Sequence, residues 1–324
     1  MLLMAKFNIM AYRYPPTSGV CFYRPPCCRA FPDNANGVLI FIYNFEQNTI
    51  FMNTKTIVRL LSLLILINFT CEAQQKPIPY GNNPAAGKYY SIRGVKLYCE
   101  IYGKGEPILM IHGNGGSMEA FKKNVPFFSK RYKVILVDSR AHGKSTDPSD
   151  SLTFEQMADD FNALLDTLHI AKTYVIGWSD GGINALLLAI RHPNKVIKLA
   201  STGANLTPDS TAIVPWLWDD MIKQYNKQKN IKWKTAKEKN DWKIFLLDYF
   251  QPNIALSELK KIKCPSLIIC GDHDLIPVEH TALIYHNIPK AYLWVVPNSG
   301  HPTLIEHTDD FNKKVNEFFT GKGF

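Results

Sequence analysis

The chain has 324 residues, of which 46% are hydrophobic and 20% charged, a composition typical of a globular protein. Its formal net charge is +9 at pH 7. The lysines are scattered among acidic residues and form no basic stripe with aromatic residues that could stack on bases, so we expect no nucleic-acid partner. No H-E-x-x-H or comparable ligand spacing occurs in the sequence, and we expect neither a metal nor a cofactor.

The first part of the chain contains an apparent export signal that begins near Met52. Basic residues follow this methionine, residues 60–69 form an apolar core, and small residues at 71–73 provide a cleavage site. The apolar core is too short to span a bilayer, which needs about 20 residues. We therefore expect a signal peptide over 52–73, an exported (periplasmic or secreted) protein and no stable membrane span in the mature chain. Residues 1–51 show no periodicity, and we interpret them as a disordered over-extension of the gene model.

From residue 74 onward, apolar runs of strand length alternate with amphipathic segments of helical period. Most of the later runs are continuously apolar, which is typical of strands covered on both faces. Strands alternating with helices predict an α/β fold with a mostly parallel sheet and helices on both of its faces. The first two runs have no helix between them, which indicates an antiparallel start. The expected strands lie near residues 89–94, 95–103, 107–113, 132–138, 173–179, 196–202, 266–272 and 291–297.

Residues 206–255 interrupt this alternation. They contain no good strand pattern but hold four of the six tryptophans of the chain. We expect a small helical cap over one end of the sheet. Its tryptophans either pack within the cap or line a substrate pocket, and the sequence leaves both interpretations open.

The stretch GWSDGG, residues 177–182, matches the G-x-S-x-G pattern at the junction between an expected strand and an expected helix. In this context the glycines permit a tight turn that raises the Ser179 hydroxyl above the sheet edge. The first N–H groups of the following helix point to the same place and can bind negative charge. The motif therefore predicts that Ser179 is a nucleophile.

A serine hydroxyl needs a base, and the base needs an acceptor that fixes its tautomer. His301, just after the last expected strand, is the candidate base, with His142 as the less favoured alternative. Asp272 and Asp274 follow the strand at 266–272, and either can be the acceptor. The chain order Ser179, Asp274, His301 matches the Ser…Asp…His order of α/β-hydrolases.

The stretch IHGNGGS, which follows the strand near 107–113, is positioned to complete an oxyanion hole. The backbone N–H groups of Asn114 and Asp180 are the candidate donors. Neither a dinucleotide-binding nor a phosphate-loop pattern fits the spacing of the glycines in this chain.

Together these motifs resemble the α/β-hydrolase superfamily over roughly residues 88–320. The resemblance rests on YGKGEPILMIHGNGG, VILVDSRAHGKS, GWSDGG, CGDHDLIP and NSGHPTLIEH, in the family's order. It implies one hydrolase domain over 74–324, an eight-stranded sheet, a cap at about 206–255 before the acid, and a triad of Ser179, Asp274 and His301. GWSDGG is most similar to the biphenyl-hydrolase-like branch, which includes valacyclovirase-type ester hydrolases.

Asp180 and Trp178, beside the expected nucleophile, are candidate substrate-binding residues. A carboxylate close to a developing oxyanion is repelled unless it points aside or meets a cation. A substrate ammonium group would supply that cation, so α-amino-acyl esters are candidate substrates. Alternatively, the Asp180 carboxylate caps the N-terminus of its own helix and does not contact substrate.

These observations predict a serine hydrolase of a small-molecule ester, thioester or amide. A carbon–carbon bond hydrolase of dienone type would use the same triad and remains an alternative. A protein that binds a ligand on the same fold without turnover is a second alternative.

Overall fold

The computed structural model describes residues 78–322. The expected extension at 1–51 and the expected signal peptide at 52–73, on which the prediction of export depends, lie outside this range. Within it, no helix combines the length and the apolar character that crossing a bilayer requires.

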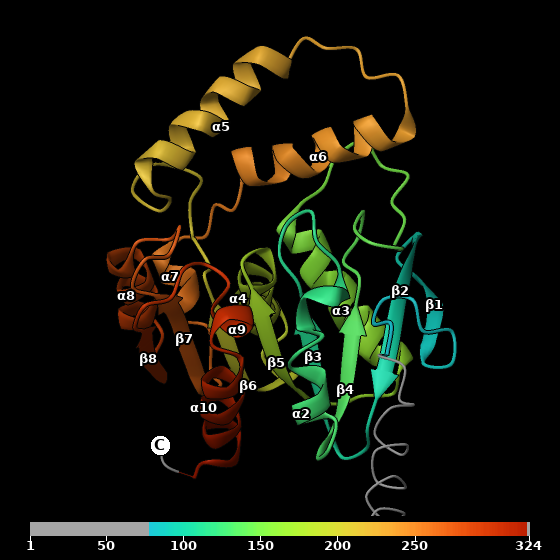
Figure 1. Cartoon of the computed structure of the whole chain (residues 1–324), viewed down its shortest axis with the longest axis vertical. Coiled ribbons are helices and arrows are strands. Elements are labelled where there is room, and N and C mark those ends of the chain that lie inside the picture. Colours follow the sequence, from blue (N-terminus) through green and yellow to red (C-terminus); the bar gives the residue numbers. More distant parts are fainter. Residues whose placement is uncertain (1–77, 323–324) are drawn as a thin grey trace, which may run out of the picture. The chain divides into compact units, whose positions relative to one another are not determined.

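Eight strands form one sheet, in the order β1-β2-β4-β3-β5-β6-β7-β8 (Figure 1). β2 pairs antiparallel with β1 and β4, and all other neighbouring strands are parallel. The prediction of a mostly parallel sheet with an antiparallel start is thus confirmed. The strands are β1 (Gly87–Ile92), β2 (Val95–Tyr102), β3 (Glu106–Ile111), β4 (Tyr132–Val137), β5 (Thr173–Trp178), β6 (Val196–Thr202), β7 (Ser266–Gly271) and β8 (Ala291–Val296).

Two hydrophobic clusters, one on each face, explain why the central strands are apolar at every position. In β3, Leu109 and Ile111 belong to one cluster, while Ile108 and Met110 belong to the other. Successive side chains of a strand point to opposite faces, so burial on both faces requires an apolar residue at each step.

Helices cover both faces of the sheet. Residues of α3 (Phe154–Thr167), α4 (Asp180–Arg191), α7 (Leu256–Leu259) and α8 (Val278–Asn287) join the cluster that contains Leu109. Residues of η1 (Met118–Phe121), α2 (Val125–Phe128), α9 (Thr303–Glu306) and α10 (Thr308–Thr320) join the cluster that contains Met110. This three-layer arrangement is the α/β-hydrolase fold expected from the sequence.

The segment between β6 and β7 carries α5 (Pro215–Gln228) and α6 (Ala236–Phe250), which lie beyond the carboxyl ends of the strands (Figure 1). α6 is bound to the core through Lys243, whose buried Nζ donates to Asp147 Oδ2 at 2.8 Å and to the Ser149 carbonyl at 2.8 Å. α5 has no fully buried residue. α6 therefore anchors the cap, and α5 packs mainly on α6.

Stacked aromatic rings join α5 to α6. Tyr225 of α5 stacks on Tyr249 of α6 with ring centroids 4.3 Å apart, and Trp218 stacks on Tyr249 at 5.4 Å. Trp242 belongs to the same stack through Tyr225 and Phe245. Packing within the cap thus accounts for these tryptophans.

Candidate active site

The GWSDGG stretch forms a sharp turn between β5 and α4. Ser179 has φ 57° and ψ −121°, a conformation that costs a non-glycine residue about 1–3 kcal/mol. The neighbouring backbones approach so closely that a Cβ at Gly177 would lie 2.0 Å from the Gly181 carbonyl oxygen, and one at Gly181 would lie 1.9 Å from the Ile111 carbonyl oxygen. The glycines are therefore required by close contact, and the turn presents the serine hydroxyl at the end of the sheet.

Ser179, His301 and Asp274 form a continuous hydrogen-bonded chain. The Ser179 hydroxyl donates to His301 Nε2 at 2.9 Å, and Nδ1–H of the imidazole donates to Asp274 Oδ1 at 2.6 Å. A carboxylate only accepts, so this contact assigns the proton to Nδ1 and leaves Nε2 as the acceptor facing the hydroxyl. The Asp274 side chain is fully buried, whereas that of His301 is 15% exposed. The arrangement has the geometry of a nucleophile, a base and an orienting acid.

Asp272, the alternative acid, has a different set of partners. Its two carboxylate oxygens accept from the backbone N–H groups of Asn298 and Ser299, each at 3.0 Å. These hydrogen bonds lower the pKa of the Asp272 carboxyl group. Asp272 therefore braces the loop that carries His301, while Asp274 contacts the imidazole itself.

The loop after β3 lies against the nucleophile. A Cβ at Gly113 would lie 3.6 Å from Ser179 Oγ, and within residues 78–322 the N–H groups of Asn114 and Asp180 donate to no protein acceptor. His112 fixes this loop, because its Nδ1–H donates to the Gly113 carbonyl at 2.8 Å and its Nε2 accepts from Ser139 N–H at 3.0 Å. The two unpaired N–H groups can receive an oxyanion.

His112 and His142 both lie outside the hydrogen-bonded chain of Ser179. Burial lowers the pKa of His112 to about 4, so its ring stays neutral at ordinary pH. The His142 ring lies 5.4 Å from that of His112, and its Nδ1–H donates to the Arg140 carbonyl. Its buried Nε2 has no hydrogen-bond partner in the described structure.

Trp178 contacts the base from the side of the strand. Its Nε1–H donates to the backbone carbonyl of His301 at 3.0 Å, and the two rings lie 5.9 Å apart. Neither Trp178 nor any of the cap tryptophans lines the main cavity next to the site. These contacts give Trp178 a positioning role toward His301, and the substrate contact expected from the sequence stays a prediction.

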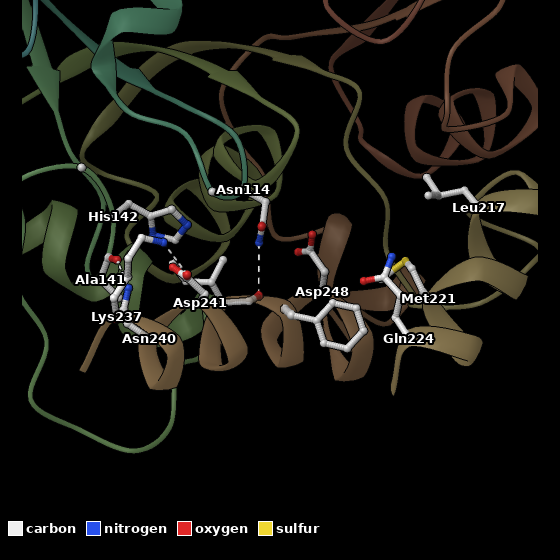
Figure 2. A pocket seen from close by; sticks show the side chains of 14 residues that line it. Asn114, Ala141, His142, Leu217, Met221, Gln224, Lys237, Asn240, Asp241 and Asp248 are labelled. Atoms are coloured by element: carbon white, nitrogen blue, oxygen red, sulfur yellow. Dashed lines mark hydrogen bonds and ion pairs between the residues drawn. The ribbon is translucent and has the colours of Figure 1, made fainter. Parts of the chain in front are cut away.

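A cavity of about 640 Å³ lies between the loops of the core and the cap. Figure 2 shows Asn114, His142 and Asp248 around it, with Met221 and Gln224 contributed by α5. Ser179 does not itself line this cavity, but Asn114 connects the two, since its loop adjoins the serine. The lining residues are Asn114, Gly115, Ala141, His142, Gly143, Leu217, Met221, Gln224, Lys237, Asn240, Asp241, Ile244, Phe245 and Asp248.

Asp248, which the sequence analysis did not single out, lies near Asp180, and the two carboxyl groups affect one another's pKa. Asn114 Nδ2 donates to Asp180 Oδ2 at 3.0 Å. Burial raises the pKa of both carboxyl groups, and the charge of Asp180 raises that of Asp248 further. The Asp180 side chain thus accepts from Asn114, and no backbone N–H group of its own helix donates to it in the described structure. In the described part of the chain, no group of three or more His, Cys, Asp or Glu residues could hold a metal ion.

Comparison with known proteins agrees with this architecture. Residues 106–236 match the family model described as the alpha/beta hydrolase fold. The serine hydrolase BPHL of Mus musculus is 27% identical over 76% of this chain and 91% of its own length. A 2-hydroxy-6-oxo-6-(2'-aminophenyl)hexa-2,4-dienoic acid hydrolase of Metapseudomonas resinovorans is 23% identical over 72% of this chain and 90% of its own. The crystal structure of an enol-lactonase of Burkholderia xenovorans superposes with a TM-score of 0.61, covering 72% of this chain and all of that one at 24% identity.

Proposed function

The chain belongs to the α/β-hydrolase superfamily, and we propose that it is a serine hydrolase that cleaves a small carboxylic ester, thioester or amide through an acyl-enzyme. The observation that carries this proposal is the continuous hydrogen-bonded chain from Ser179 through His301 to Asp274. Without these hydrogen bonds to a base and an acid, the serine at the turn would not be an activated nucleophile.

In the proposed mechanism, Ser179 Oγ attacks the carbonyl carbon while His301 Nε2 takes the hydroxyl proton. Asp274 holds the imidazole in the reactive tautomer and stabilises the imidazolium. The N–H groups of Asn114 and Asp180 receive the oxyanion of the tetrahedral intermediate. When the intermediate collapses, the leaving alcohol, thiol or amine takes the proton from His301. Water then attacks the acyl-enzyme by the same route and restores the serine.

We further propose that the preferred acyl groups carry an α-amino function. Asp180 places a buried carboxyl group next to its own N–H group, and the described contacts give this carboxyl group no lysine or arginine partner. A substrate ammonium group would pair with it. The similarity to the serine hydrolase BPHL accompanies this argument but does not specify a substrate.

A second candidate is the hydrolysis of a carbon–carbon bond in a dienone acid, which several relatives of this chain carry out according to their names. Such substrates are carboxylates. The cavity presents Asp241 and Asp248, and Lys237 is the lysine among its lining residues. Since Lys237 is already paired with Asp241, an anionic substrate would meet uncompensated negative charge. We therefore rank this activity below ester hydrolysis.

The experiment that tests the proposed function combines active-site labelling with a substrate panel. A fluorophosphonate probe should label Ser179, identified by peptide mass, and Ser179→Ala should lose labelling and roughly 10⁴-fold or more of kcat. The panel should contain neutral nitrophenyl esters, α-amino esters and vinylogous diketone acids. Labelling of another residue, or unchanged hydrolysis by Ser179→Ala, would overturn the proposal. Saturable binding of the esters without product in either protein would favour a non-catalytic ligand-binding role.

A further inference from the structure

The cap carries an exposed cluster of lysines that the proposed mechanism does not use. Residues 223–239 contain seven lysines and a single acidic residue, whereas the rest of residues 78–322 contains 23 basic and 24 acidic residues. The excess positive charge of the described chain therefore comes from this short stretch. The lysine cluster consists of Lys223, Lys227, Lys229, Lys232, Lys234, Lys237 and Lys239, all of which are exposed.

The lysine cluster spans the end of α5, the loop after it and the start of α6, beyond the carboxyl ends of the strands (Figure 1). In the described part of the chain, Lys237 is the one member that forms an ion pair, with Asp241. Glu238 caps the start of its own helix. Asp219 and Asp220, the two exposed acids of α5, lie about one turn before the cluster begins. The protein itself therefore leaves most of this positive charge uncompensated.

Exposed apolar side chains accompany the lysines. Ile231 lies in the middle of the cluster and is 45% exposed, and Trp216 of α5 is 65% exposed. Trp216 shares the outward face of α5 with Lys223 and Lys227, because separations of seven and eleven residues return to the same side of a helix. The opposite face carries Tyr225, which stacks on α6. Lysines interspersed with exposed tryptophan and isoleucine are typical of surfaces that lie on an anionic bilayer.

A nucleic acid is the other common polyanion, and the aromatic residues of this stretch disfavour it. Binding of a single strand uses aromatic rings on which the bases can stack. The rings within the cluster are already packed in the cap, because Tyr225 stacks on Tyr249 and Trp233 contacts Trp242 with centroids 5.9 Å apart. The observations therefore favour lipid headgroups over bases.

We propose that the lysine cluster and its exposed apolar neighbours dock the cap on the anionic surface of a lipid bilayer. The lysines bind the headgroup phosphates, and the side chains of Ile231 and Trp216 enter the boundary between headgroups and acyl chains. Lys237 of the cluster also lines the cavity next to the active site, so docking holds this cavity beside the bilayer. The proposal concerns a surface and does not depend on the chemistry of the triad.

The test is co-sedimentation of the full chain with phosphatidylcholine vesicles that contain about 30% phosphatidylglycerol, at about 50 mM salt, where charge screening is weak. Vesicles of phosphatidylcholine alone are the neutral reference. The cluster variant combines Lys227→Gln, Lys229→Gln, Lys232→Gln and Lys234→Gln. Each lysine near an anionic surface strengthens partition about fivefold, so the variant should bind anionic vesicles about 100-fold or more weakly, with no change on neutral vesicles.

A matched control removes the same charge from the opposite edge of the sheet. It replaces exposed lysines that precede β3, β4 and β7, in the combination Lys104→Gln, Lys130→Gln, Lys260→Gln and Lys263→Gln. We expect its partition to fall about threefold at most, because these positions lie more than a Debye length from a bilayer at the cap. Both variants keep residues 1–77, so any vesicle binding by that segment is common to them, and melting curves verify that both fold.

Ile231→Ser separates a bilayer from other polyanions. It should weaken partition into anionic vesicles about fivefold through lost apolar burial, and leave binding to a single-stranded oligonucleotide unchanged. Equal losses in the cluster variant and the control would overturn the proposal, as would unchanged vesicle binding by the cluster variant. An oligonucleotide that displaces the protein from vesicles at equal phosphate concentration would assign the cluster to nucleic acids instead.

Discussion

The assignment of Asp274, rather than Asp272, as the orienting acid leads to a paired prediction for Asp274→Asn and Asp272→Asn. Asp274 Oδ1 accepts from His301 Nδ1–H and from Ile276 N–H, while its Oδ2 accepts from Gly271 N–H. Three donors therefore surround this carboxylate, and an asparagine has one acceptor oxygen for them.

An asparagine at position 274 can adopt two orientations, and each one impairs the base. If its NH₂ group faces His301, the imidazole must move its proton to Nε2 and can no longer accept from Ser179. If its NH₂ group faces the Gly271 N–H, the tautomer is kept, but two donors oppose one another and the negative charge that stabilises the imidazolium is lost. From serine triads in general we expect kcat to fall about 10⁴-fold, equivalent to about 5 kcal/mol of transition-state stabilisation.

Asp272→Asn should behave differently, because Asp272 accepts from backbone N–H groups of the loop that carries His301 and pairs with the neighbouring His273, not with the His301 imidazole. The substitution loosens that loop without removing a partner of the imidazole, and we expect kcat to fall about tenfold at most. Both kcat and KM should be measured on a neutral nitrophenyl ester, with circular dichroism melting curves to verify folding. Equal losses in the two folded variants, or a loss below tenfold for Asp274→Asn, would refute the assignment.

Two further substitutions test how the site is supported. Lys243→Met removes the buried ammonium group that holds the cap to Asp147. We expect the free energy of unfolding to fall by about 3 kcal/mol and Tm by about 10 °C in a calorimetric scan. A shift under 2 °C would contradict the anchoring role. Gly203→Ala would place a Cβ 2.7 Å from His301 Cε1 and should lower kcat about 10²-fold, because the imidazole ring is displaced. Gly94 has a similar positive φ with open space around it, so Gly94→Ala is the control and should leave kcat unchanged. Equal kcat values for the two variants would contradict this prediction.

The meeting of Ser179 and His301 could be predicted because the order of the parallel strands brings the relevant loops to one edge. β5, β6, β7 and β8 are neighbours, so segments after their carboxyl ends begin within about 15 Å of one another. Ser179 directly follows β5, and the loop after β8 returns His301 to it. The strand pattern and the motif together therefore predicted that Ser179 and His301 lie side by side, as the structure has them.

The choice between Asp272 and Asp274 could not be made from residue types, since both acids follow β7 within the same turn. The two acids differ in the partners of their hydrogen bonds. Asp272 faces the backbone of the neighbouring loop, and Asp274 turns toward the imidazole. In the same way, the place of Trp178 beside Ser179 in sequence did not reveal that its indole bonds to the backbone of His301.

Asp248 could not be recognised from the sequence, because nothing local distinguishes it from an acid on a solvated helical face. It follows the buried Ile244 by one helical turn, so α6 presents it to the core beside an apolar contact. Asp180 belongs to another segment, and only the packing of the cap on the core brings the two carboxyl groups near one another. The charge of the cavity thus depends on tertiary packing, whereas the serine turn can be recognised from a short stretch of sequence. In this fold a relative could keep the same serine turn and favour an anionic substrate through the residue that its cap presents at this position.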